Sequence, residues 1–175
     1  MTTMACNAGP KPGSEKLIQR RIAIPKHGTL VVTVPESWKQ EVRRPPKDLP
    51  PTIEYESRSS DDFEVLITCF WHTKGDPNFN TAAEIKQLIN EDAEEMSPTV
   101  VEKKLDIKTI RGRQGTGYYY AATDKARKKG EYPLMTRAAI GVDDLLLVVT
   151  VLHQSNRSDV ADSTIKMLEN ARKEE

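Results

Sequence analysis

Two apolar runs constrain the fold of this chain more than any other feature of its sequence. FEVLITCFWH (63–72) and DLLLVVTVLH (144–153) have the length of strands and are rich in β-branched and aromatic residues. Both are apolar on their two faces, whereas a strand at a sheet surface alternates apolar and polar residues. Strands of this kind need cover on both sides, so we expect a sheet that lies between two other layers.

Two segments follow a helical period instead. Residues 76–98 place Ile85, Leu88 and Ile89 on one stripe, and Thr81 with Glu84 predicts a capping box at the start of this helix. Residues 156–175 form a second amphipathic segment. Further strands are expected at 22–24, 29–34, 52–57, 99–112, 117–124 and 132–142. Short connectors make neighbouring strands antiparallel. The sequence therefore predicts an α+β fold, an antiparallel sheet sandwiched between helices (α/β/α), in the order four strands, helix, four strands, helix.

The chain divides into a leader and one domain. Residues 1–19 are small, polar and rich in glycine and proline, which predicts a flexible leader. Residues 20–175 have the length of a single domain. Five prolines in 35–51 predict an extended connector that forms no regular ladder.

Charge and cysteine content exclude several classes of protein. The chain carries 26 basic and 26 acidic side chains, a balance that argues against a nucleic-acid partner and against an anionic membrane surface. Its two cysteines, Cys6 and Cys69, are too few for a disulfide scaffold or a closed zinc site. No apolar run approaches the ~20 residues that a membrane-spanning helix needs.

Cys6 suggests a cellular location. Small residues precede it and a tether-like stretch follows, an arrangement that resembles the end of a bacterial lipoprotein signal. Lipid attachment at Cys6 would place the protein outside the cytoplasm, in the periplasm or cell envelope, with membrane contact only through the lipid. The alternatives are an ordinary disordered tail and a truncated start. We favour the extracytoplasmic interpretation.

The order of elements, together with TLVVTVPESW (29–38) and its corner from Pro35 to Trp38, resembles the PsbP-like superfamily. This group contains the extrinsic P subunit of photosystem II, a Ran-binding nuclear-import factor and many bacterial proteins of unknown role. The resemblance covers roughly residues 20–173. It implies an α/β/α sandwich and mostly non-catalytic, protein-binding roles, and it supplies no catalytic, metal-binding or cofactor-binding residue that can be matched here.

The stretch RGRQGTG (111–117) raises the question of a phosphate-binding loop. Such loops follow a strand and open a helix, whose N-terminal amides hold the anion. Here the glycines precede YYYAATD, a strand-forming run with no lysine–threonine or lysine–serine pair. We therefore interpret the stretch as a turn between neighbouring strands.

Two further sites are alternatives to protein binding. His72 ends a buried strand near Asp76, which leaves open a small-molecule or hydrolytic site between sheet and helix that includes Tyr118. His153 ends another such strand. Residues 101–130 contain nine lysines and arginines against three acids, so an anion or nucleic-acid binder using the basic stretch 103–129 is the second alternative. Alternation, however, divides the three tyrosines between two faces.

The sequence contains no Gly-x-Ser-x-Gly elbow and no histidine spacing typical of a metal site. We therefore predict no enzyme activity, no metal and no cofactor. The expected function is a non-enzymatic accessory or protein-binding domain. Its candidate binding surface comprises Trp71, His72, Asp76, Tyr118, Arg111 and Arg113.

Overall fold

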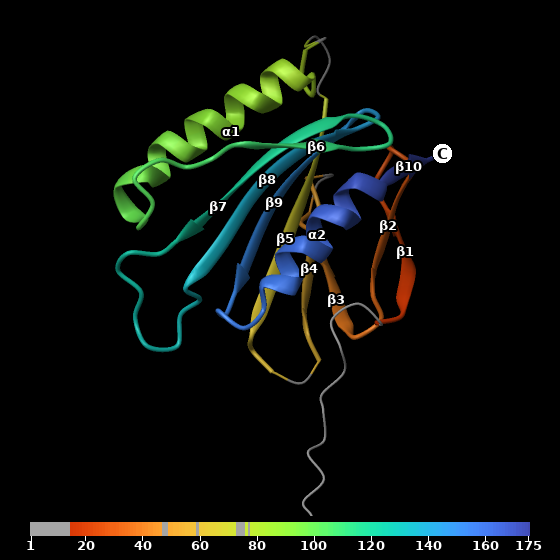
Figure 1. The fold of residues 1–175 in the computed structure, drawn as a ribbon. Coiled ribbons are helices and arrows are strands. Elements are labelled where there is room, and N and C mark those ends of the chain that lie inside the picture. Colours follow the sequence, from red (N-terminus) through yellow and green to blue (C-terminus); the bar gives the residue numbers. More distant parts are fainter. Residues whose placement is uncertain (1–14, 47–48, 59, 73–75, 77) are drawn as a thin grey trace, which may run out of the picture.

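A computed structural model describes residues 15–46, 49–58, 60–72, 76 and 78–175 as two antiparallel sheets with two α-helices (Figure 1). The larger sheet has the order β3-β4-β5-β9-β8-β7-β6, and the smaller has the order β1-β2-β10. The strands are β1 (Leu17–Ala23), β2 (Thr29–Pro35), β3 (Trp38–Arg43), β4 (Thr52–Ser57), β5 (Phe63–Trp71), β6 (Lys108–Arg111), β7 (Thr116–Thr123), β8 (Leu134–Val142), β9 (Leu145–His153) and β10 (Arg172–Glu174). The helices are α1 (Ala82–Met96), the short 3-10 helix η1 (Ser97–Thr99) and α2 (Ser158–Asn170).

The two faces of the larger sheet carry different layers. α1 lies over one face, where it packs on β7 and β8. α2 and the smaller sheet cover the opposite face, and their apolar side chains form one core with β3, β4, β5, β8 and β9 (Figure 1). The α+β class and the layered arrangement that the sequence predicted are confirmed.

β5 and β9 are the central strands, as their two-sided apolar pattern predicted. They pair along nine residues, from Phe63 opposite His153 to Trp71 opposite Leu145. His153 therefore lies at the end of this pair remote from His72, and the two histidines that end apolar strands do not meet. The predicted cap of the first helix is also present, since Thr81 Oγ1 accepts a hydrogen bond from the Glu84 N–H over 3.4 Å.

The element order matches the prediction roughly, with two additional strands. The first, β3, lies in the segment where prolines led us to expect no ladder, and that expectation is wrong for Trp38–Arg43. The prolines flank this strand without interrupting it. Trp38 also anchors it, because the buried indole packs against Tyr55 and Phe63 at ring-centre distances of 5.8 and 5.2 Å.

The second additional strand, β10, replaces the end of the predicted second helix. α2 ends at Asn170, and residues 172–174 pair with β2, which joins the first hairpin in a sheet of its own. The sequence led us to expect one sheet. Glu174 of β10 forms ion pairs with Arg21 of β1 and with Arg172, and these pairs stabilise the C-terminal strand in the smaller sheet.

The remaining boundaries differ at both ends of the fold. The strand predicted at 99–112 is limited to Lys108–Arg111, and Glu102 instead accepts hydrogen bonds from the backbone and side chain of Thr123. β1 begins at Leu17, inside the predicted leader, whereas residues 1–14, including Cys6, lie outside the described residues.

Candidate functional site

Three residues of the predicted surface, Trp71, His72 and Asp76, lie together at the end of β5. The Asp76 N–H donates a hydrogen bond to His72 Nε2 over 2.8 Å, and the His72 ring meets Phe79 edge-on with ring centres 6.0 Å apart. Half-buried Trp71 stacks on His27 at 4.9 Å. These contacts hold the end of β5 against the β1–β2 turn and the segment before α1.

The other three residues lie on β6 and β7. Tyr118 faces α1, and the Lys86 ammonium lies 5.8 Å from its ring centre. Arg111 ends β6, Arg113 lies in the turn that follows, and both are exposed. Since β9 and β8 separate β5 from β7, the two strands are about 14 Å apart. Tyr118 therefore does not join His72 in one site.

The glycine-rich stretch is the turn between β6 and β7, as predicted. The Gly112 N–H donates to the Gly115 carbonyl over 3.0 Å, and a strand, not a helix, follows. The glycines allow β8 to approach closely. A Cβ on Gly115 would lie 2.3 Å from the Gly141 carbonyl oxygen, and one on Gly117 would lie 2.5 Å from the Ala139 oxygen. These close approaches explain why positions 115 and 117 are glycine, and no bound phosphate is needed to explain them.

The basic stretch 103–129 does not form one platform. Lys103 and Lys104 follow α1, Arg111 ends β6, and the cations of residues 125–129 lie in the β7–β8 loop. As alternation predicted, Tyr119 packs against the core on the α2 side, whereas Tyr118 packs on the α1 side. Tyrosines on opposite faces cannot stack successive bases together.

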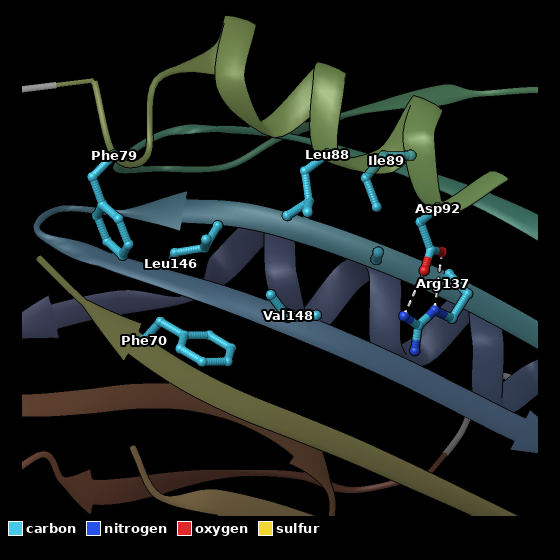
Figure 2. A pocket seen from close by; sticks show the side chains of 9 residues that line it. Phe70, Phe79, Leu88, Ile89, Asp92, Arg137, Leu146 and Val148 are labelled. Atoms are coloured by element: carbon cyan, nitrogen blue, oxygen red, sulfur yellow. Dashed lines mark hydrogen bonds and ion pairs between the residues drawn. The ribbon is translucent and has the colours of Figure 1, made fainter. Parts of the chain in front are cut away.

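A groove with a volume of about 370 Å³ lies between α1 and the part of the larger sheet that α1 leaves uncovered (Figure 2). α1 forms one wall, and β5, β8 and β9 form the floor. Phe79, which precedes α1, lies at one end (Figure 2). The lining residues are Phe70, Phe79, Leu88, Ile89, Asp92, Arg137, Ala138, Leu146 and Val148.

Strand alternation explains why apolar side chains face this groove. Cys69 points into the core on the α2 side, so its neighbour Phe70 points to the α1 side, where it is 38% exposed. The sequence placed Leu88 on the buried stripe of α1, and that placement is wrong because Leu88 is 39% exposed. α1 packs on β7 and β8, and no other layer of the described residues covers its flank toward β9.

Polar groups gather at the other end of the groove. Arg137 of β8 binds Asp92 of α1 through two hydrogen bonds, from Nη2 to Oδ1 over 2.7 Å and from Nε to Oδ2 over 3.1 Å (Figure 2). The Tyr120 hydroxyl donates to Asp92 Oδ2 over 2.5 Å, and Arg137 Nη1 donates to Thr150 Oγ1 over 2.6 Å. This network ties the helix to three strands.

The network sets the ionisation of its members. Burial alone would raise the pKa of Asp92, but hydrogen bonds from Arg137 and Tyr120 outweigh it and hold that pKa below its usual value. Burial and the bond to Asp92 raise the pKa of Tyr120 well above its ordinary range. At neutral pH the network therefore contains a carboxylate, a guanidinium and a neutral phenol.

A second polar cluster lies at the β8–β9 turn. His27 Nδ1 lies 2.9 Å from Asp144 Oδ2, and Lys173 Nζ lies 2.8 Å from Asp144 Oδ1 and 3.2 Å from Asp143 Oδ2. Burial opposes the charge on Asp144, but the bonds to Lys173 and His27 lower its pKa. The cluster fastens β10 to the larger sheet, a structural role that the contacts fully explain.

Among the residues that the structure describes, nucleophilic and metal-binding groups do not gather in the groove. Cys69 faces the opposite core, and burial raises the pKa of its thiol to about 12. Among the described residues, no three histidine, cysteine, aspartate or glutamate side chains are grouped so that they could hold a metal ion. In the same part of the chain, no helix is long and apolar enough to cross a membrane.

Comparison with solved structures shows which fold this is. No protein-family model and no curated protein matches the chain. The solution structure of cyanobacterial PsbP (CyanoP) from Synechocystis sp. PCC 6803 superimposes with a TM-score of 0.54 and 10% identity, over 95% of this chain and 98% of that one. The chain has a PsbP-like fold. At this identity the likeness concerns the fold alone.

The groove was not predicted from the sequence, although a signal for it exists. FEVLITCFWH and DLLLVVTVLH carry apolar residues on both faces, and a helix covers only about two strands because its diameter is ~10 Å. One helix on the α1 side therefore cannot cover a sheet of seven strands. Comparing helix width with strand number would have indicated an open surface.

Proposed function

We propose that this chain is a non-enzymatic accessory domain that binds another protein through the groove between α1 and the larger sheet. One observation carries the proposal. Phe70 and Leu88 are 38% and 39% exposed beside an apolar floor, whereas the other face of the same strands is buried. Contiguous exposed apolar surface with a polar margin is typical of protein-interaction sites.

The groove's chemistry favours binding over catalysis. Its two ionisable lining residues, Asp92 and Arg137, are paired with each other, and each has a further partner, Tyr120 for Asp92 and Thr150 for Arg137. A general acid or base needs a polar group free to exchange a proton with a substrate. Satisfied groups of this kind instead form a polar margin that orients a bound apolar segment.

Site-specific photocrosslinking in the source cell tests the proposal. A photoreactive residue is placed at Leu88 or, as the matched control, at Val101, an apolar residue that is 61% exposed on another surface. We expect a protein adduct at position 88 that is absent at 101, and the purified adduct partner should then bind the unmodified chain. Equal adducts at both positions, or none at 88, would contradict the proposal.

A small apolar molecule is the second candidate occupant. The volume of about 370 Å³ lies in the range of ligand pockets, and Phe79 narrows one end next to His72. The sequence suggested a site near His72, Asp76 and Tyr118, and none of these three lines the groove, although His72 contacts Phe79 at its end. A low-molecular-mass adduct at position 88, with no protein adduct, would favour it.

We further propose that lipid attached to Cys6 tethers the domain to the cell envelope. The leader's resemblance to a lipoprotein signal supports this step. Mass spectrometry of the N-terminal peptide from the native source tests it, with Cys6→Ser as the control. An unmodified peptide that begins at Met1 would contradict the proposal.

A further inference from the structure

The mainly apolar strip of sheet next to α1, formed by β9 and β5, has the width of one α-helix. A helix about 10 Å wide covers about two strands spaced ~4.8 Å apart, and α1 accordingly packs on β7 and β8. The next two strands, β9 and β5, present their α1-side residues beside it. A second helix lying parallel to α1 would rest on these two strands.

The floor at this position is mainly apolar. β9 contributes Leu146, Val148 and Leu152, with Thr150 between the last two. β5 contributes Leu66 and Phe70, with Thr68 between them. From Leu146 to Leu152 the floor extends about 20 Å, which corresponds to ~13 residues of α-helix. An amphipathic helix of three to four turns would cover it with one apolar stripe.

Acidic side chains border this floor on both sides. On α1, the side that carries Leu88 and Asp92 also carries Glu84, Glu91 and Glu95, because residues three and four apart share a helix face. From β5 outward, the same face of the sheet carries further acids. These are Glu64 on β5, Glu54 and Glu56 on β4, and Glu41 on β3.

The bases on these described faces do not offset the acids. There are three, Lys39, Arg43 and Arg137, and each is already in an ion pair. Among the described residues, Glu64, Glu84 and Glu95 make no ion pair. Burial and the neighbouring Glu54 raise the pKa of Glu64, as expected where negative charges gather. The whole chain carries equal numbers of acidic and basic side chains, so the excess of acids is a feature of this surface and not of the protein as a whole.

We propose that the groove binds an amphipathic α-helix of a partner protein whose apolar stripe is flanked by lysine and arginine; the inference rests on the proposed protein-binding function. The apolar stripe would cover Phe70, Leu88 and Val148. The cationic flanks would lie against Glu64 on one side and against Glu84 and Glu95 on the other. Helix-in-groove recognition uses this combination of anchors and charge.

Fluorescence anisotropy with three labelled 18-residue peptides tests the inference on the full chain. The basic peptide has leucines at i, i+3, i+4 and i+7 with lysine elsewhere. The acidic peptide replaces every lysine with glutamate, and the scrambled peptide keeps the basic composition without the stripe. We expect the basic peptide to bind at least tenfold more tightly than either control, and its affinity to fall as salt rises.

Matched variants locate the binding surface. Phe70→Gln and Leu88→Gln should each weaken basic-peptide binding at least tenfold, whereas Leu17→Gln and Val101→Gln, at exposed apolar residues elsewhere, should not. The triple change of Glu64, Glu84 and Glu95 to glutamine should weaken it several-fold and flatten its salt dependence. As the control, the change of exposed Glu15, Glu169 and Glu175 to glutamine should alter neither the affinity for the basic peptide nor the salt dependence of that affinity. Circular dichroism confirms that each variant is folded.

Several outcomes would overturn the inference. If acidic and basic peptides bind equally and Leu88→Gln weakens both, the protein-binding groove stands and the cationic helix is wrong. If no peptide binds, the helical occupant is wrong, and the crosslinking experiment decides the proposed function separately. Binding only after removal of residues 1–14 would assign the groove to the chain's own leader. A dimer that Leu88→Gln dissociates would assign it to a second copy.

Discussion

The two faces of the central strands differ sharply in how they are covered. On the α2 side, Ile67 and Val149 are fully buried beneath the helix and the smaller sheet. On the α1 side, Phe70 and Val148 of the same two strands remain partly open. Because alternate residues point to opposite faces, β5 and β9 supply both a closed core and an open binding surface. Substitutions on one face should therefore leave the other largely unaffected.

The largest expected effect comes from two phenylalanines on one strand. Phe63 faces the closed core, where it packs on Trp38 and lies under the Arg157 guanidinium, whereas Phe70 faces the groove. Phe63→Ala should lower the free energy of unfolding by about 3–5 kcal/mol. Phe70→Ala should lower it by about 1–2 kcal/mol, since the residue is already 38% exposed to water. Urea denaturation measures both values, and equal losses would break the distinction between the faces.

An intermediate effect is expected at the polar end of the groove. Asp92→Asn weakens the bonds from Arg137 and Tyr120 and should lower the free energy of unfolding at pH 7 by about 1–3 kcal/mol. The pKa of Asp92 is lower in the folded chain than in the unfolded chain, so its ionised form stabilises the fold above the unfolded pKa. The difference between wild type and variant should shrink as pH falls through that value toward the folded pKa.

The control for this pH dependence is Asp162→Asn, an exposed carboxylate on α2. Its difference from wild type should stay within about 0.5 kcal/mol across the same pH range. Denaturation curves between pH 3 and pH 7 measure both variants. A loss for Asp92→Asn that does not diminish on acidification would show that Asp92 is not held in its charged form.

Polar substitution in the groove should have the smallest effect on stability. Leu88→Gln removes an apolar side chain that is 39% exposed and makes no core contact of the kind that Ile85 makes. We expect a change within about 0.5 kcal/mol in the free energy of unfolding. Thermal and urea denaturation measure it. A loss of 2 kcal/mol or more would mean that Leu88 belongs to the core.

Much of the fold could be predicted because local patterns determine it. The two-sided apolar runs identified β5 and β9 as central strands, and Thr81 with Glu84 identified the start of α1. β3 and β10 could not be predicted in this way. Trp38 is held by Tyr55 and Phe63, which are remote in sequence, and β10 forms only because β2 offers an edge.

The candidate site was less accessible to sequence reasoning. Helical spacing assigns Leu88 to the apolar stripe of α1, but it does not show where the helix crosses the sheet. Asp92 and Arg137 are 45 residues apart, and neither belongs to a motif. Only the position of α1 over β7 and β8 brings them together and leaves β9 and β5 uncovered.

Thiol labelling at adjacent positions of β5 tests the account most directly. In a Cys6→Ser background, the native Cys69 thiol faces the closed core, while the thiol of a Phe70→Cys variant would face the groove. We predict that Cys69 stays unmodified by a maleimide in the folded chain. The Phe70→Cys thiol should react at a rate near that of Val101→Cys, and the basic peptide should slow only the former, at least tenfold. An unreactive Phe70→Cys thiol, or one that the peptide does not protect, would contradict an open, helix-binding face.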